Sequence, residues 1–487
     1  MRSNYIQFNS PQFRVLSDKQ IEELHLATLQ ILERTGVTFE CEEAIKLLGE
    51  AGIDVSNPKR VKIPSYLVEQ ALRTTPETIT LYTRDGEMAM TLNGTGCHFG
   101  GNLALDKYLD PYTRQPRRCY VKDIGDMARV FDALPNIEWA MNTSDNSTIP
   151  GAIADKVGFL HTLLNTTKPI VCQFLQISSV EEMRQVAAIV AGGEKELRAK
   201  PFFVGSSLSV SPLFQGENAM QVSLICAEKL IPNVVYNMPI GGATAPAGFP
   251  AILALGNAEF LSQLVVIQLK RPGAPVIYGS QPGILDMKTT IYAYGAPEAH
   301  FLDAALTQLG RYYGLPVYGT AGQSDTDVVG AQAATEATYQ ILLGALSGAD
   351  FLHGLGEMDI GRMASPEYAV LANEIIDMVK VVMGGIEINA ETLPLDLIEK
   401  VGPGGTFISE KHTLKNFRRF WSPTVFDRTM AKNGDTKRCE ELLNEKAIQI
   451  LETHRPKPLP DTVLKELEKI EKRWLKEVGL KAYPEKI

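Results

Sequence analysis

Residues 318–337 read "YGTAGQSDTDVVGAQAATEA" and place three patterns in direct succession: a buried strand, a polar loop and a helix-forming run. The small and apolar residues before Gln323 are typical of the end of a buried strand, and the Ala-rich run that follows is typical of a helix. Asp325 and Asp327 lie between them with no Lys or Arg nearby. A strand that passes through a polar loop into a helix is half of a βαβ unit.

The same strand, loop and helix pattern recurs along the chain. Four of the apolar runs begin at residues 137, 169, 201 and 233, at an interval of 32 residues. Alternating strands and helices of this length indicate a parallel sheet, and eight such units predict a (β/α)8 TIM barrel. A doubly wound open sheet is the alternative, but no Gly-rich phosphate loop follows the first strand. The predicted strands are 96–101, 137–143, 169–175, 201–208, 233–240, 274–281, 315–322 and 350–356.

The two ends of the chain differ from this pattern. Residues 1–95 are predicted to form an N-terminal helical region, in which Ser17 and Gln20 make a capping box before a helix that ends at Gly36. Residues 96–390 form the predicted barrel. Residues 391–487 are dense in charge and predict a C-terminal helical extension that packs on the barrel or on a neighbouring subunit, which favours a homo-oligomer.

Composition narrows the classes of partner. The net charge of −9 and the pI of about 5.5 argue against nucleic acid or an anionic membrane surface. No run of about 18 apolar residues occurs, because polar residues interrupt the most apolar stretch, 251–269, so no membrane span is predicted. No signal-peptide pattern is present, and none of the six cysteines forms a CxxC pair. These features predict a reducing, cytoplasmic location.

In a barrel, the loops that follow the strands gather at one mouth and build the active site. These loops are rich in amide, hydroxyl and small side chains and poor in Lys and Arg, with Arg362 the nearest cation, which disfavours a phosphate substrate. The expected mouth residues are Gly101, Asn102, Asn142, Ser144, Asp145, Asn146, Gln173, Gln176, Ser206, Ser207, Ser209, Asn237, residues 241–244, Gln281, residues 323–327, His353, Glu357 and Asp359.

Aromatic residues also occur near the strand ends. An aromatic and acidic pocket without its own cations suits a cationic ligand, because aromatic faces attract quaternary ammonium groups. The alternative is that these side chains form the barrel core. The aromatic residues concerned are Phe99, Phe174, Tyr236, Tyr278, Tyr318 and Phe351.

His353 and Glu357 lie four residues apart after the eighth predicted strand. On a helix this spacing could bind metal, but Gly354 and Gly356 favour a loop. Three roles stay open for His353: a partner for a substrate carboxylate, a structural histidine, or a metal ligand with Asp325 and Glu357 in a barrel lyase. Other catalytic motifs are missing, since no GxSxG, P-loop or GxGxxG occurs.

Several segments, in order along nearly the whole chain, resemble the trimethylamine methyltransferase (MttB-like) superfamily. They are the helical opening at 16–55, the segment "VKIPSYLVEQALRTTPETITLYTRDG" at 61–86, the spaced pattern "HFGG...LD..T...R" that begins at His98, and "GQSDTDVVGAQAATEA" at 322–337. The resemblance implies a barrel enzyme that moves a methyl group from an amine to the cobalt of a separate corrinoid protein. That protein would dock at the mouth, and no cofactor would be bound permanently. "DFLHGLG" at 350–356 is one residue longer than the Asp-x-His-x-x-Gly motif of corrinoid-binding domains, so no integral cobalamin domain is predicted.

The branch of the family that acts on trimethylamine carries pyrrolysine, whereas this sequence has only standard residues. The resemblance therefore favours the branch that acts on betaines, with glycine betaine expected first and proline betaine, carnitine or γ-butyrobetaine next. A quaternary ammonium already carries its positive charge, so a tertiary amine can leave without a general acid. The protein then only has to exclude water, hold the cation and orient one N-methyl group.

The resulting hypothesis assigns a role to each candidate residue. Phe174, Tyr236 and Tyr278 would surround the ammonium, and Asp325 and Glu357 would add negative charge. His353, with Gln323 or Asn237, would hold the carboxylate, and Gln173 would complete the substrate site. The mouth is expected to be wide and open, because a corrinoid protein has to cover it. The alternatives are a metal-dependent barrel lyase that uses Asp325, His353 and Glu357, and a betaine-binding protein without catalytic activity.

Overall fold

The structure is a computed structural model that describes residues 12–102, 105–142, 148–428 and 437–484. Eight parallel strands form a closed barrel, in the order β11-β13-β16-β17-β4-β7-β8-β9. Pairing of Phe351 with His98 and of Leu352 with Phe99 joins the last strand to the first and closes the ring. The predicted TIM barrel is confirmed, and each strand overlaps its predicted range. The strands are β4 (His98–Asn102), β7 (Trp139–Asn142), β8 (Ile170–Cys172), β9 (Phe203–Leu208), β11 (Asn233–Tyr236), β13 (Val276–Gly279), β16 (Val317–Thr320) and β17 (Phe351–His353).

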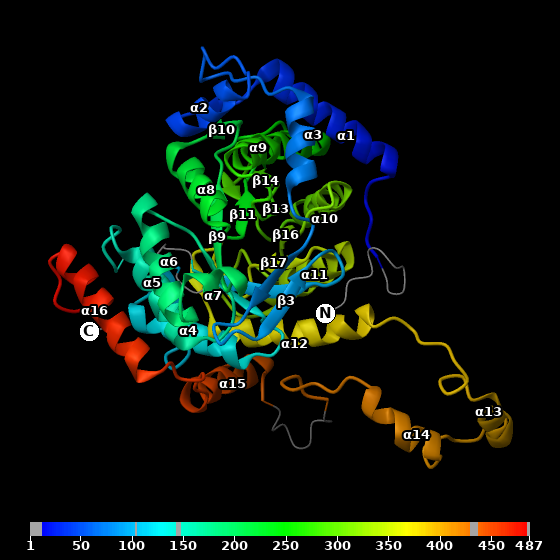
Figure 1. The fold of residues 1–487 in the computed structure, drawn as a ribbon. Coiled ribbons are helices and arrows are strands. Elements are labelled where there is room, and N and C mark those ends of the chain that lie inside the picture. Colours follow the sequence, from blue (N-terminus) through cyan, green and yellow to red (C-terminus); the bar gives the residue numbers. More distant parts are fainter. Residues whose placement is uncertain (1–11, 103–104, 143–147, 429–436, 485–487) are drawn as a thin grey trace.

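Helices between consecutive strands cover the outside of the barrel (Figure 1). One of them, α9 (Phe249–Lys270), is long and apolar enough to cross a membrane, but 94% of its apolar window is buried inside the molecule. It is therefore a core helix of the barrel layer. The others are α4 (Val121–Ala133), α5 (Ala154–Asn165), α6 (Ile177–Ala191), α7 (Glu194–Ala199), α8 (Glu217–Lys229), α10 (Pro297–Tyr312), α11 (Ala331–Ser347) and α12 (Pro366–Met383).

The N-terminal region covers the outer face of α9 and then closes one end of the barrel. It contains α1 (Asp18–Gln30), a π-helical turn (Ile31–Thr35), β1 (Thr38–Phe39), α2 (Glu42–Glu50) and α3 (Ser65–Thr74). The predicted capping box is present, since Ser17 accepts from the Gln20 N–H and Gln20 accepts from the Ser17 N–H. The helices end at Thr74, and the last part of the region predicted to be helical contains an antiparallel hairpin of β2 (Ile79–Tyr82) and β3 (Met88–Leu92).

This hairpin closes the end of the barrel where the strands begin. Its buried side chains, among them Leu81 and Leu92, form one apolar cluster with the barrel interior, which includes Trp139, Val204 and Phe351. Asp350, directly before β17, anchors the end of the hairpin. Its carboxylate accepts from the N–H groups of Asn93 at 3.0 Å and Gly94 at 2.6 Å and also pairs with Arg311.

Two small sheets extend the strands at the opposite end, the mouth. One contains β12 (Ile240–Gly241), β14 (Gly283–Asp286) and β15 (Ile291–Tyr292). The other contains β18 (Glu357–Met358), β19 (Met363–Ala364), β5 (Lys107–Asp110) and β6 (Gln115–Arg118). They follow β11, β13, β17 and β4 in the chain, so they build a rim over the strand ends. A further pair joins β1 to β10 (Phe214–Gln215).

The C-terminal region divides into two parts with different surroundings. The last helices, α15 (Cys439–Thr453) and α16 (Asp461–Glu477), bury apolar residues against the same chain, such as Leu443 and Trp474. By contrast α13 (Leu395–Val401), α14 (Lys411–Asn416) and the 3-10 turn Phe417–Arg419 bury none and stand apart from the barrel (Figure 1). The predicted helical extension is therefore present, and only part of it packs on its own barrel.

Candidate active site

Five of the predicted site residues meet inside the mouth end of the barrel. Tyr236, at the end of β11, points inward with the interior cluster, and Gln173 donates from Nε2 to its hydroxyl. The Tyr236 ring lies 5.8 Å from the Tyr318 ring, which in turn lies 5.1 Å from the His353 ring. Strands β8, β11, β16 and β17 thus contribute to one surface, as the parallel barrel requires.

Glu357 and Gln323 form the polar part of this surface. Gln323 donates from Nε2 to Glu357 Oε2 at 2.8 Å, and Gln281 donates from Nε2 to Gln323 Oε1 at 3.1 Å. Left-handed glycines at 322, 354 and 356 turn the chain after β16 and β17 so that these side chains face one another. The result is a carboxyl group that is 2% exposed and accepts from an amide.

His353 lies beside this carboxylate, with Nε2 at 3.9 Å from Glu357 Oε1. Burial lowers the pKa of His353 to about 3, so the imidazole is neutral at physiological pH. Its Nδ1 atom is buried and has no hydrogen-bond partner among the residues that the structure describes, and the same holds for Asn102 Oδ1 at the end of β4. Buried polar atoms of this kind favour a bound polar ligand or water at the site.

Asp325 has a different role from the one predicted. Its two carboxylate oxygens accept from the N–H groups of Tyr294 and Gly295, each at 2.9 Å, and thereby anchor the loop before α10. Burial raises the pKa of Asp325, and the neighbouring Glu336 contributes to this shift. Glu336, which the sequence interpretation did not identify, accepts from the Ser324 hydroxyl and holds the same loop from α11.

Three predicted site residues point away from the barrel interior, which corrects the predicted enclosure of the ammonium. The Tyr278 hydroxyl donates to Asn257 of α9 at 3.0 Å, and its ring packs on Phe260. Asn237 donates from Nδ2 to the Gly256 carbonyl of the same helix at 2.8 Å. The Phe174 ring packs edge-on against Phe203 in the layer between strands and helices. Alternate residues of a strand face opposite sides of the sheet, and these three fall on the outer side.

The described site is more enclosed than expected. Gln323 and Glu357 are each 2% exposed and His353 is 5% exposed, because the two rim sheets rise above the strand ends. The predicted mouth residues Ser144, Asp145 and Asn146 lie outside the described residues. Two cations of the rim are paired, since Lys107 and Arg362 contact Asp359 at 2.8 and 2.9 Å. The carboxyl group of Glu357 lies at the interior surface of the described part.

The predicted metal-binding triad does not assemble, because both oxygens of Asp325 are engaged by Tyr294 and Gly295. Within the described ranges, no group of three or more His, Cys, Asp or Glu side chains is arranged to hold a metal ion. Gln281 and Tyr318 join the site although no substrate role was assigned to them. Their positions at the ends of predicted strands were the signal that could have identified them.

Comparisons with known proteins agree with this geometry. The family model "Trimethylamine methyltransferase (MTTB)" matches residues 1–479. A trimethylamine methyltransferase MttB of Desulfitobacterium hafniense is 33% identical, over 95% of this chain and 94% of the relative. A glycine betaine methyltransferase from the same species is 29% identical, over 96% of this chain and 98% of the relative.

Among solved structures, the monomethylamine methyltransferase of Methanosarcina barkeri superposes with a TM-score of 0.53 at 12% identity, over 96% of this chain and 89% of that one. At this identity the likeness shows the fold alone. The match of the family model over almost the whole length, together with the relatives above 30% identity, shows that the chain belongs to the trimethylamine methyltransferase family.

Proposed function

We propose that the protein transfers a methyl group from a quaternary amine of the betaine class to the Co(I) centre of a separate corrinoid protein. One observation carries the proposal: the side chain of Glu357 is buried beside the tyrosine-lined interior, where its carboxylate accepts from Gln323. A relative over nearly the full length is named a glycine betaine methyltransferase, which supports the same substrate class.

The electrostatics of the site favour a permanent cation. An anion next to an ionised Glu357 would be repelled, whereas a trimethylammonium group would be attracted to it. The ring of Tyr318 lies 5.1 Å from the His353 ring beside the carboxylate cluster and can contact N-methyl groups. This arrangement replaces the predicted enclosure by Phe174 and Tyr278.

The carboxylate of the betaine needs donors that are distant from Glu357. His353 is a poor choice because it is neutral and lies 3.9 Å from Glu357. Gln173 and Tyr236 belong to strands β8 and β11, each three positions from β17 around the barrel, and carry N–H and O–H donors. We therefore assign the carboxylate to Gln173 and Tyr236, and we assign His353 a hydrogen-bond role beside the cation.

The chemistry that follows needs little from the protein. When the C–N bond breaks, its electron pair stays on nitrogen and the methyl group passes to the metal acceptor, so a neutral tertiary amine leaves without accepting a proton. The neutral His353 fits this step, because the leaving amine needs no proton. The chain's own contribution is to position the substrate and exclude water.

A second candidate substrate is trimethylamine, because relatives of that name are slightly more similar than the betaine enzyme. A tertiary amine has to be protonated or otherwise activated before an amine can leave from it. The described site offers no group for this step. We further propose that a corrinoid protein docks at the mouth, that the enzyme is a homo-oligomer and that it acts in the cytoplasm.

The test is a methyl-transfer assay with reduced Co(I) cobalamin and a panel of N-methylated compounds: glycine betaine, proline betaine, carnitine, γ-butyrobetaine and trimethylamine. We expect one betaine to give methylated cobalamin together with its demethylated amine. Turnover of trimethylamine alone would favour the second candidate. Betaine binding without turnover would favour a non-catalytic binding protein, and a stoichiometric bound metal ion would favour the lyase.

A further inference from the structure

A long excursion of the chain, residues 384–423, projects from the body and is referred to here as the arm. The chain leaves α12 after Met383 and returns to it at Thr424, whose N–H donates to Glu374 Oε1 at 2.7 Å. Between these points Figure 1 shows α13 and α14 standing clear of the barrel. Both ends of the arm are therefore anchored on the same helix, while its middle extends into solvent.

The surface of the arm is strongly apolar. Ile386 is 90% exposed, Ile408 is 83% exposed and Phe420 is 75% exposed. Isolated exposed apolar residues are common, but a concentration of large ones on one segment marks an interaction site. The other exposed apolar residues of the arm are Ile388, Leu393, Leu395, Ile398, Phe407, Leu414 and Phe417.

The contacts that shape the arm are polar. Lys415 pairs with Glu391 at 2.8 Å, the Glu391 carbonyl lies 2.9 Å from His412 Nε2, and Lys400 pairs with Glu410 at 3.0 Å. Helices of 7 and 6 residues without a buried face are not stable in water on their own. The packing that would hold α13 and α14 must therefore come from another surface.

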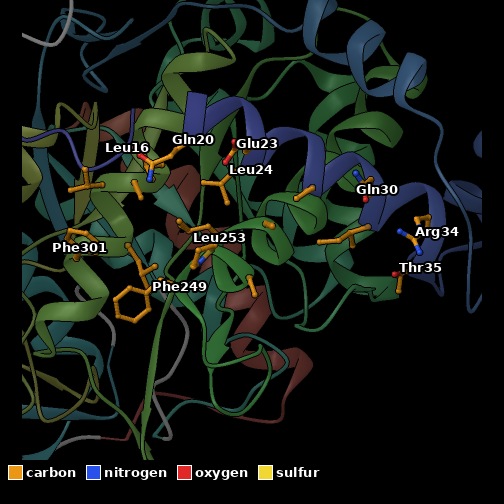
Figure 2. A pocket seen from close by; sticks show the side chains of 18 of the residues that line it. Leu16, Gln20, Glu23, Leu24, Gln30, Arg34, Thr35, Phe249, Leu253 and Phe301 are labelled. Atoms are coloured by element: carbon orange, nitrogen blue, oxygen red, sulfur yellow. The ribbon is translucent and has the colours of Figure 1, made fainter. Parts of the chain in front are cut away.

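A matching surface lies on the outside of the barrel between α1 and the helices α9 and α10. It is a groove of about 990 Å³ with a floor of aliphatic and aromatic side chains, including Leu253, Phe249 and Phe301. Figure 2 shows Phe249 and Phe301 at one end of the groove and Arg34 at the other, with Gln20 and Glu23 on the edge formed by α1. Phe301 is 40% exposed.

We propose that the arm of one copy occupies this groove on a second copy of the chain. The arm starts from α12, and α11 lies between α12 and the groove formed with α9 and α10. In Figure 1 the arm also points away from α1, so it is directed away from the groove of its own chain. Each copy carries one arm and one groove. Two copies can therefore exchange arms, which buries both apolar surfaces and gives a closed, symmetric dimer. The cations of 411–419 flank Leu414, Phe417 and Phe420, which suits an apolar floor with Glu23 on its edge.

The corrinoid protein fits this surface less well. The arm leaves the barrel at the end that the hairpin closes, because Lys380 near the end of α12 donates to Asn136 in the loop that leads into β7. A methyl acceptor has to approach the opposite end, where the candidate active site lies. The arm therefore serves assembly of the enzyme, whatever substrate the site accepts.

The test compares the mass in solution of four proteins by analytical ultracentrifugation. The wild type is expected to sediment as a multiple of its 53.5 kDa chain. A double variant of the arm, Leu414→Glu with Phe420→Glu, and a groove variant, Phe301→Glu, should each fall to the mass of one chain. Tyr112→Glu, at a side chain that is 59% exposed outside both surfaces, should keep the wild-type mass. Thermal unfolding should be reported for all four, to show that the variants are folded.

A cross-linking experiment locates the contact. In a Cys439→Ser background, which removes the one exposed cysteine of the described chain, Leu414→Cys protein is mixed with Ala27→Cys protein and oxidised. A disulfide between the two different chains supports the proposal, and the same mixture with Lys469→Cys in place of Ala27→Cys should give none. A monomeric wild type, an arm or groove variant that keeps the wild-type mass, or equal cross-linking to Lys469→Cys overturns it.

Discussion

Replacing Glu357 by Gln is the sharpest test of the proposed cation site. The substitution removes the charge and keeps the size and planar shape of the side chain. Gln323 can still donate to the remaining carbonyl oxygen, so the hydrogen bond of 2.8 Å has a substitute. The side chain is 2% exposed, and the loss is therefore a change of buried charge rather than of surface charge.

The magnitude follows from Coulomb's law. Two unit charges about 5 Å apart, at an effective dielectric constant of about 20, attract by about 3 kcal/mol. Part of this gain offsets the removal of water from both groups, so we expect a net loss of about 2–3 kcal/mol. Since about 1.4 kcal/mol corresponds to a factor of ten, the dissociation constant for the betaine should rise by roughly 30- to 150-fold.

Calorimetric titration with two ligands of the same shape separates the effect of the ligand's positive charge from the effect of its shape. The first is glycine betaine, and the second is 3,3-dimethylbutanoate, in which a carbon atom replaces the charged nitrogen. Glu357→Gln should weaken binding of the first and leave the second unchanged or stronger. Glu336→Gln, which changes a carboxylate that holds Ser324 from α11, is the matched control and should affect neither ligand beyond about twofold. An equal loss for both ligands, or an unchanged constant for betaine, would refute the reasoning.

Three further predictions concern placement and stability. Tyr278→Phe removes a hydroxyl that donates to α9, so it should lower the free energy of unfolding by about 1 kcal/mol and leave the betaine dissociation constant unchanged. Tyr236→Leu should raise that dissociation constant, and equal effects of the two variants on binding would contradict the orientation of the two rings. Asp350→Ala removes the buried carboxylate that accepts from Arg311 and from the N–H groups of Asn93 and Gly94, and it should lower the free energy of unfolding in urea by about 3–5 kcal/mol. A loss below about 1 kcal/mol would show that the hairpin is held by apolar packing alone. Burial lowers the pKa of His353 to about 3, so the unfolded chain takes up this proton at a higher pH than the folded chain, and the free energy of unfolding should fall by up to about 1.4 kcal/mol per pH unit below about pH 6.5. His353→Gln should flatten this dependence between pH 7 and 5, and the same loss of stability in the variant would falsify the buried, neutral state of His353.

The strands of the barrel were predictable because each combines a short apolar run with a polar loop and a helix. The directions of their side chains were not. A strand that is buried on both faces shows no alternation of polar and apolar residues, so nothing in "NVVYNMPI" tells that Tyr236 faces inward and Asn237 outward. The prediction that Tyr278 faces the interior was wrong for the same reason. His353 ends its strand, and Gln323 and Glu357 lie in the loops after theirs, so the prediction that they lie at the mouth end needed only the strand positions.

The hairpin at residues 79–92 was missed although the sequence carries its signal. Asp85 and Gly86 stand between "ITLY" and "MAMTL", and an Asp-Gly pair between apolar runs is typical of a tight hairpin. The helical character of the preceding segments dominated the interpretation. The arm is a different case. Its apolar residues are interspersed with charges and resemble an ordinary amphipathic cover, and only the structure shows that they stay exposed.

The hairpin that closes the barrel has a consequence for the sequence of events during turnover. With Leu81 and Leu92 filling the lower end, the small donor and the bulky acceptor of the proposed reaction would both use the mouth. The donor would then have to bind first, because the larger acceptor would cover the site behind it. The demethylated amine would leave after the acceptor, so initial-rate kinetics should show a compulsory order with the amine released last.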